Sequence, residues 1–555
     1  MSVSVLLILG ATTALLLTRL PGDGVPSVSA DAIELFLFIT LVCRFIYRAA
    51  IFPQFISPLR HYPTAPIGIP FIGHGFAQFS HPRGAAFLEL MKTIPNSGVI
   101  RYFSFFNTEY LLLTNSEALS EVLVRRPYDF EKSPAARNLI RRFTGSKLLT
   151  AEGEEHKQVR KSMRPAFHFR RIKDLYPVFW AKATEMTDDI NDCAQLGGNG
   201  LITGNITTWV EKAMLNTIGR SVFGVDVNDE ESRSKLLKLF ATGGSTGWDL
   251  QLVFMVSAFL PRWVLKLIPG GINNRIDEAH AGAQIACEAL LNERKRIPRT
   301  GDHKDILGQF IESRSFTDEE LKDQIPSLLA AGWELPPRIM VSSTDKCYCR
   351  FEPTSAAFAW VVWYLIQYPD WQTKLRDEIK AHVPYQFLTD NAAEFDPQVL
   401  DNLPILNAVC NESFRFMPTS PVISRQASCE TTILGQRVPE GTRLLITPYA
   451  INHFEKSYGP TAGAFDPSRW INDNGTANNS GNARSNYAFL TFLHGPRKCI
   501  GDLYARATVR AFVASLVGRF KFEMAQVGDV PTPGGMLTVK PKGGIEMKLC
   551  RVDPW

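Results

Sequence analysis

The sequence predicts one large domain with long helices behind an N-terminal membrane anchor, and three observations support this prediction. The 555 residues contain no Gly/Ser tract, charge block or internal repeat that would divide the chain. Residues 317–334 and 354–370 are apolar runs of helical length, the first opening with Thr317 and Glu320 at capping-box spacing. Two further apolar stretches stand at the N-terminus.

Composition narrows the class of protein. The chain is 45% apolar and 21% charged, which is ordinary for a globular protein. A net charge of +5 is too small to indicate nucleic acid as a partner. Nine cysteines without framework spacing favour free thiols on the reducing side of a membrane.

The N-terminal 50 residues are predicted to be a membrane anchor. Residues 1–18 carry no charge and have about the length that crosses a bilayer. A second apolar stretch, 32–52, has Glu34 at one end and Arg44 and Arg48 at the other, which places the rest of the chain in the cytoplasm. Whether one or both stretches span is left open, and a cleaved signal peptide is the alternative for the first.

A connector and a single domain follow the anchor. Residues 51–75 contain Pro63, Pro66 and Pro70, which predict a stiff, extended connector. Residues 76–555 are predicted to form the single large domain.

The strongest chemical signal lies near the C-terminus, in FLHGPRKCIG. Its spacing is F-x-x-G-x-R-x-C-x-G, formed by Phe492, Gly495, Arg497, Cys499 and Gly501. The glycines let a loop fold around the cysteine, and a helix beginning just beyond it favours the thiolate. A thiolate held this way can ligate haem iron, and the guanidinium can meet a haem propionate. The alternative is a buried structural cysteine beside a surface arginine.

With this motif the sequence resembles the cytochrome P-450 family of haem-thiolate monooxygenases, from about residue 60 onward, and in general style its fungal microsomal members. NESFRF places Glu412 and Arg415 three residues apart, as in the family's E-x-x-R pair. FDPSRW matches the P-x-R-[FW] element, and the resemblance implies that Arg469 completes a buried Glu-Arg-Arg network. The implied fold is mainly α with a small β portion.

The resemblance implies further haem contacts. His156 and Arg160 stand where the family usually has W-x-x-x-R, so Arg160 is expected to reach a propionate and His156 to donate in place of an indole N–H. An exposed helical histidine is the alternative. Arg425 resembles a strand arginine that binds a second propionate. Seven basic residues in 157–173 suggest the docking face for a flavoprotein, although a solvated helix fits equally.

The implied activity is an oxidoreductase reaction of the EC 1.14 type. Haem b, ligated by Cys499, would insert one oxygen atom of O2 into a lipophilic small molecule, in secondary metabolism. Electrons would come from NADPH through a membrane-bound cytochrome reductase, with cytochrome b5 as a further candidate partner. The implied location is the endoplasmic reticulum membrane. Trp333, Phe358 and the aromatic segment 101–113 are expected to line the substrate pocket.

The family's distal helix is interrupted in this chain. The family carries [AG]-G-x-[DE]-T-[TS], whose acid and alcohol deliver protons during oxygen activation. Here Glu334 is separated from Thr354 by nineteen residues, 335–353, that contain two adjacent prolines and five charged residues. Removing them leaves AGWETSAAFAW, which matches the family pattern. We therefore interpret 335–353 as translated intron or another gene-model error that the functional protein lacks.

Other interpretations of this interruption remain. A genuine insertion would separate Glu334 from Thr354, admit water and impair protonation. Reductase-independent isomerases or dehydratases of the same family do not need the distal alcohol, so they are one alternative. An inactive haem-binding or haem-less relic is the other.

Overall fold

The computed structural model describes residues 30–66, 68–144, 147–197, 201–225, 281, 285, 287–296, 305–330, 352–389, 395–535 and 538–555. The chain divides into two compact units. The smaller comprises Met1–Phe76 and Arg101–Tyr110, and the larger comprises Ala77–Ile100 and Leu111–Trp555.

The smaller unit begins with helix α2, Ala30–Ile46, which continues as a π-helix, Tyr47–Ile56. Within the described residues, one stretch, Glu34–Ile56, is long and apolar enough to cross a membrane, with a mean hydropathy of 2.0 and 6% of it buried. The apolar stretch 1–18 lies outside the described residues. Part of the predicted connector is helical, because the π-helix runs to Ile56 and a 3-10 turn covers Pro58–His61.

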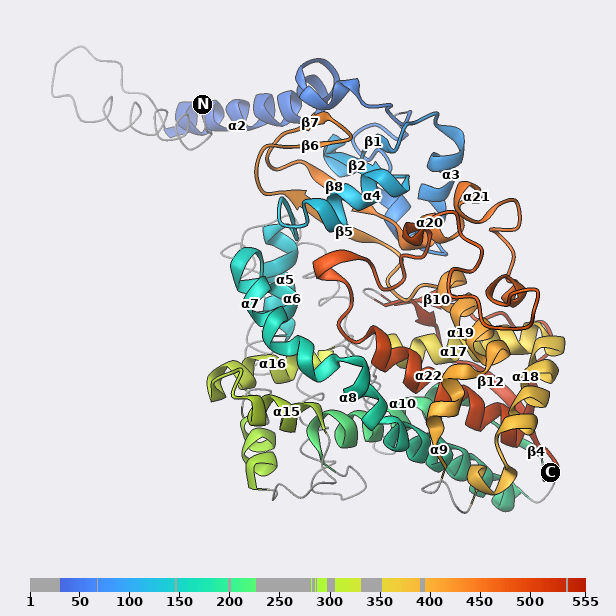
Figure 1. Ribbon diagram of the computed structural model, residues 1–555. Coiled ribbons are helices and arrows are strands. Elements are labelled where there is room, and N and C mark those ends of the chain that lie inside the picture. The colour runs from blue at the N-terminus through green and yellow to red at the C-terminus, as the bar shows by residue number, and fades with distance from the viewer. Residues whose placement is uncertain are drawn as a thin grey trace, which may run out of the picture. The chain divides into compact units, whose positions relative to one another are not determined.

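The larger unit is mainly helical, as predicted (Figure 1). Its helices are α3 (Ala85–Thr93), α4 (Ser116–Ser120), α5 (Pro134–Thr144), α6 (Lys147–Thr150), α7 (Gly153–Met163), α8 (Phe169–Asp174), α9 (Tyr176–Gly197), α10 (Ile206–Ile218), α15 (Ile306–Ser313), α16 (Asp318–Ala330), α17 (Glu352–Gln367), α18 (Pro369–His382), α19 (Pro404–Phe416), α20 (Pro448–Asn452), α21 (Glu455–Tyr458) and α22 (Asp502–Arg519).

The β portion is small, which confirms the predicted fold class. The strands are β1 (Val99–Phe103), β2 (Glu109–Leu113), β3 (Phe130–Glu131), β4 (Leu201–Asn205), β5 (Ile423–Ala427), β6 (Thr431–Ile433), β7 (Gln436–Val438), β8 (Arg443–Ile446), β9 (Phe520–Met524), β10 (Pro533–Gly534), β11 (Lys540–Pro541) and β12 (Glu546–Arg551).

Two sheets organise most of the strands. The larger has the order β1-β2-β8-β5-β3, and its antiparallel β5–β8 pair sets Arg425 opposite Leu444. In the other, β12 lies between β4 and β9, both antiparallel to it.

Helix α22 forms the centre of the core. It packs against α9, α17, α18 and α19, and is buried along most of its length (Figure 1). A helix that is apolar on most faces needs neighbours all round, and these four supply them. Because α22 begins three residues after Cys499, the core fixes the end of the cysteine loop.

Both helices flanking the interruption form as predicted. Glu320 N–H donates to Thr317 Oγ1 at 3.2 Å, and Glu320 Oε2 accepts from Thr317 N–H at 2.9 Å, so the capping box is confirmed. Helix α17 resumes at Glu352. Residues 331–351 lie outside the described residues.

Candidate functional site

The cysteine loop is closed by its own backbone. Cys499 N–H donates to the carbonyl oxygen of Phe492 at 2.9 Å, and Lys498 N–H donates to that of Gly495 at 3.0 Å. Gly495 has φ 75°, and a Cβ there would collide with the carbonyl oxygen of Leu123, so only glycine fits. A Cβ on Gly501 would instead meet no atom within 4 Å.

The surroundings of the Cys499 thiol act in opposite directions on its charge. Burial raises the pKa of Cys499, while a backbone hydrogen bond from Gly501 and the charge of Arg160 lower it. Cys499 itself is exposed to solvent. Desolvation and the hydrogen bond from Gly501 act on the thiol pKa in opposite directions, and the expectation that the loop favours the thiolate stays a prediction.

Aromatic packing fixes Phe492 at the other end of the loop. Its ring meets Phe414 of α19 edge-on, with centroids 5.8 Å apart. The guanidinium of Arg506, on α22, lies 4.7 Å from the Phe492 centroid and donates to Asp502 at 2.6 Å. The loop is thus fastened to both α19 and α22.

Arg497 lies in a buried cluster of charges. Its Nε donates to the carbonyl oxygen of Pro127 at 3.1 Å, its guanidinium stacks on Tyr128 with 5.0 Å to the centroid, and it forms an ion pair with Glu152. Arg497 Nη2 is buried and has no hydrogen-bond partner among the described residues. A buried guanidinium nitrogen without an acceptor indicates that an anion belongs there.

Positive charge in this cluster exceeds negative charge. Lys132 lies 3.8 Å from Glu152, and burial together with Arg425 lowers the pKa of Lys132 to about 8. Burial and Arg497 lower the pKa of Arg425 to about 10. The single carboxylate of Glu152 therefore faces three cationic side chains.

His156 is buried on α7, which excludes the exposed alternative. Its Nδ1 lies 3.2 Å from Tyr128 Oη, and burial followed by Arg497 lowers the pKa of His156 to about 4, so the ring is neutral at pH 7. Arg160, one turn further along α7, is half-buried. Burial lowers the pKa of Arg160, and the nearby sulfur of Cys499 opposes that shift.

These residues fit a haem group. Two propionates would balance the excess charge of the Lys132, Arg425 and Arg497 cluster, and one could accept from Arg497 Nη2. Cys499 could ligate the iron.

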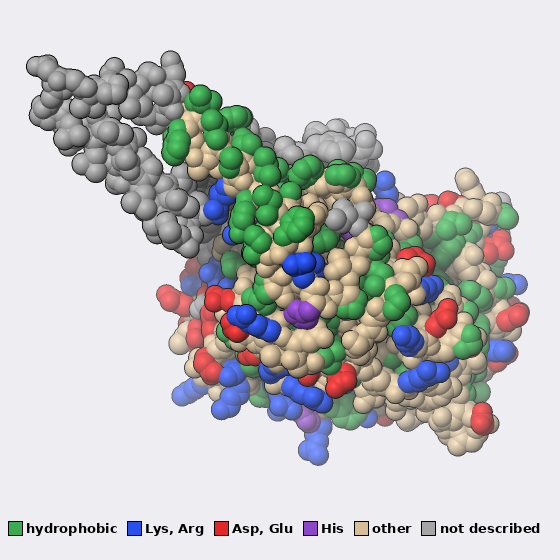
Figure 2. Space-filling view, turned by 90° about the horizontal axis from the view of Figure 1, so that it is seen from above, with side chains coloured by type: hydrophobic (Ala, Val, Ile, Leu, Met, Phe, Trp, Pro, Cys, Tyr) green, Lys and Arg blue, Asp and Glu red, His purple; other side chains and the backbone are tan. Residues whose placement is uncertain are grey.

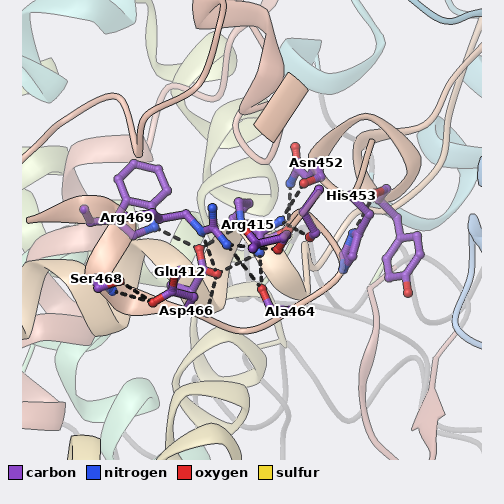
Figure 3. Close-up of polar contacts among 12 residues, drawn as sticks. Glu412, Arg415, Asn452, His453, Ala464, Asp466, Ser468 and Arg469 are labelled. Carbon is purple, nitrogen blue, oxygen red and sulfur yellow. Dashed lines mark hydrogen bonds and ion pairs between the residues drawn. The ribbon is translucent and has the colours of Figure 1, made fainter. Parts of the chain in front are cut away.

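Glu412, Arg415 and Arg469 form a buried network (Figure 3). Arg415 donates twice to the Glu412 carboxylate, each time at 2.7 Å, and Arg469 Nε donates to it at 3.1 Å. Trp470 Nε1 and the Asp466 N–H also donate to it, at 2.9 and 2.8 Å. The remaining Arg415 donors reach the carbonyl oxygens of Asn452, Ala462 and Ala464.

Asn452 joins this network to the cysteine loop. Its amide donates to the Arg415 carbonyl oxygen at 2.9 Å (Figure 3). The amide also donates to Thr491 Oγ1 at 3.1 Å, and Asn452 Oδ1 accepts from Leu490 N–H at 2.9 Å. Thr491 directly precedes Phe492. The two hydrogen bonds of the Asn452 amide therefore connect Arg415 of the buried network to Thr491, at the start of the cysteine loop.

The residues predicted for the distal helix and the substrate pocket are only partly described. Glu334 and Trp333 lie outside the described residues, and Thr354 is half-buried in the first turn of α17. Phe358 is fully buried and packs edge-on against Phe512 of α22, with centroids 6.1 Å apart. Its role in lining a substrate pocket stays a prediction.

Sequence reasoning missed Lys132, Glu152, Tyr128 and Asn452. The first three come from segments with no motif, and only the fold brings them to Arg497. A weak signal existed for Glu152, which stands four residues before His156 at helical spacing.

Comparison with known proteins gives one family. The sequence model of the family described as "Cytochrome P450" matches residues 63–334 and 348–549. Among curated relatives, the cytochrome P450 monooxygenase abl5 of Leptosphaeria maculans is 43% identical over 518 residues, which cover 92% of this chain and 91% of the relative. The cytochrome P450 monooxygenase sphH of Aspergillus fumigatus is 35% identical over 525 residues, covering 93% and 92%. With the cysteine motif and the matched helices, these likenesses show that the chain belongs to the cytochrome P450 family.

Proposed function

We propose that the chain is a membrane-anchored haem-thiolate monooxygenase that inserts one oxygen atom of O2 into a lipophilic small molecule. The observation that carries this proposal is Cys499 in its closed loop, beside a buried cluster with excess positive charge. Kinship with fungal P450 monooxygenases supports the reaction class and a role in secondary metabolism. The anchor favours a membrane location, for which we propose the endoplasmic reticulum.

The residues divide the work in this mechanism. Haem bound at Cys499 supplies oxygen activation and one-oxygen transfer. Arg497, Lys132 and Arg425 would hold and neutralise its propionates, and neutral His156 could donate a further hydrogen bond through Nε2. The Glu412 network keeps the loop in place. Thr354 would hold a proton donor on the distal side, with Glu334 as its acidic partner.

NADPH would reduce the protein through a flavoprotein reductase, with cytochrome b5 as a further partner. The basic segment 157–173 supports this, because Lys157, Lys161 and Arg171 are exposed on α7 and α8. Arg160, in the same segment, interacts electrostatically with the sulfur of Cys499. An acidic partner docking here would be attracted by these charges.

We further propose that the functional protein lacks residues 335–353. The family match supports the loss of most of this segment, because it stops at Glu334 and resumes at residue 348. Excision would bring Glu334 next to Thr354. Sequencing of the spliced transcript tests the proposal, and a normally abundant message that encodes the segment would overturn it.

The same break favours a second candidate, a reductase-independent isomerase or dehydratase, if the segment is retained. Separation of Glu334 from Thr354 would impair proton delivery, which such enzymes do not need. Turnover with NADPH and reductase, compared with turnover on a hydroperoxide alone, distinguishes the two. A relic would show neither.

The decisive experiment is the carbon monoxide difference spectrum of purified protein, with and without residues 335–353. Thiolate ligation predicts an absorption band of the reduced carbon monoxide complex at about 450 nm. Cys499→Ala should abolish the band, whereas Cys429→Ala, at an exposed thiol, should retain it. A band that survives Cys499→Ala would overturn the proposal.

A further inference from the structure

Lys498, Asp502 and Arg506 form a chain of ion pairs beside the cysteine loop, and we call them the charged triad. Lys498 Nζ lies 2.5 Å from Asp502 Oδ2, and Arg506 Nε lies 2.6 Å from Asp502 Oδ1. The triad belongs to the larger unit, whereas the hydrophobic side chains that gather on α2 (Figure 2) suit the proposed anchor. Cys499 directly follows Lys498, so the charges of the triad are close to the sulfur.

Asp502 is the enclosed member of the triad. It is the first residue of α22 and is 6% exposed. Burial would raise the pKa of Asp502, but Arg506 and Lys498 hold it below its ordinary value, so the carboxyl group is ionised at pH 7. A carboxylate in the first turn also opposes the positive end of the helix. Asp502 therefore places a negative charge where the helix alone would place a positive one.

The Arg506 guanidinium is held from several sides. Its Nη1 donates to Asn411 Oδ1, on α19, at 2.5 Å. Its central carbon lies 4.7, 5.2 and 5.6 Å from the ring centroids of Phe492, Phe489 and Phe414. Rotating the side chain away would break these contacts, so the charge stays at a fixed place relative to the cysteine loop.

The members of the triad act on the sulfur in opposite directions. Burial raises the pKa of Cys499 most, Asp502 raises it further, and Lys498 lowers it. Fastening of the loop alone would not call for a carboxylate, because a negative charge beside a thiolate is electrostatically unfavourable. A nearby carboxylate does, however, favour the more positive oxidation state of a metal ion bound to the sulfur, and a nearby cation favours the less positive one.

We propose that the charged triad acts through Cys499 to set the reduction potential of the haem iron, with Asp502 lowering it and Arg506 and Lys498 raising it. The inference rests on the proposed function, because it needs haem bound at Cys499. The iron takes up one electron from the flavoprotein reductase, and ferrous iron carries one positive charge fewer than ferric iron. The three side chains are positioning residues in this reaction, since they act through the sulfur.

The test is a spectroelectrochemical titration of the purified, haem-loaded full chain without reductase. Asp502→Asn should raise the potential and Arg506→Gln should lower it. Each change should alter the equilibrium between ferric and ferrous protein about tenfold, which is about 59 mV for one electron. Asp502→Glu and Arg506→Lys keep the charges and should stay near the wild type. The double variant Asp502→Asn with Arg506→Gln should fall between the two single variants.

Asp401→Asn is the matched control on the same helix. Asp401 pairs with Arg510 at 2.7 Å, one turn beyond Arg506 on α22, and these two side chains are 20% and 16% exposed. Loss of this more distant carboxylate should shift the potential less than Asp502→Asn does. Lys498→Gln, at a side chain that is 44% exposed, keeps the test available if the enclosed variants do not bind haem, and it should lower the potential slightly.

Shifts of the same sign in Asp502→Asn and Arg506→Gln would overturn the inference, because damage to the loop would then explain both. Equal shifts in Asp502→Asn and Asp401→Asn would also overturn it, as would an unchanged or higher potential in Lys498→Gln. Unchanged potentials in variants that retain the carbon monoxide band would overturn this inference alone. A wild-type protein without that band would overturn the proposed function, and this inference with it.

Discussion

Two buried charged regions of the larger unit differ in how their charges are satisfied. In the Glu412 network, the carboxylate accepts five hydrogen bonds and each Arg415 nitrogen has an acceptor. In the Glu152 cluster, one carboxylate faces Lys132, Arg425 and Arg497, and Arg497 Nη2 has no hydrogen-bond partner among the described residues. The first region is complete by itself and serves structure. The second requires an anion, and we infer that it serves binding.

The largest expected effect comes from breaking the complete network. Glu412→Gln should destabilise the protein by about 3 to 5 kcal/mol, because two buried arginines lose their counter-charge. Thermal unfolding and the yield of folded protein measure this. Glu430→Gln is the matched control, since Glu430 pairs with Arg437 but is 62% exposed, and it should change little. Equal stability of the two variants would contradict the assignment.

The second prediction concerns the excess charge itself. In the folded state the pKa of Lys132 is lowered to about 8, below its unfolded value of 10.5, so the unfolded chain binds more protons between these pH values. Stability of haem-free protein should therefore rise as pH increases from 8 to 10.5, and Lys132→Met should add about 2 to 3 kcal/mol at pH 7. Denaturant unfolding at several pH values measures both effects, and a pH dependence unchanged in the variant would contradict them.

The third prediction separates binding from folding. Arg497→Met should speed haem dissociation about 10- to 100-fold, through loss of charged hydrogen bonds worth about 1.5 to 3 kcal/mol. Glu152 keeps Lys132 at 3.8 Å, so the fold should survive. Haem transfer to an acceptor globin measures the rate. Arg415→Met, in the complete network, should instead fail to fold, and similar behaviour of the two variants would remove the distinction.

The smallest expected effect is that of Tyr128→Phe. It removes the 3.2 Å contact to His156 Nδ1, worth about 0.5 to 1.5 kcal/mol, while the ring keeps its stacking on Arg497. We expect the midpoint of thermal unfolding to fall by a few degrees, and the carbon monoxide difference spectrum to stay unchanged. A shift as large as that of Glu412→Gln would show that Tyr128 has a different role.

Sequence patterns predicted features whose determinants are local. The capping box at Thr317, the resumption of α17 and the backbone hydrogen bond that closes the loop from Phe492 to Cys499 each depend on residues that are close in the sequence. The pair Glu412 and Arg415 was visible for the same reason. Lys132 and Asn452 were not, because their partners are distant in sequence and no spacing marks them.

The excess charge of the Glu152 cluster has a consequence for biosynthesis. In a newly made chain, the positive charges of Lys132, Arg425 and Arg497 would repel one another until the two propionates of haem neutralise them. We expect maturation to keep pace with haem supply, so that starved cells accumulate immature chains that proteolysis removes.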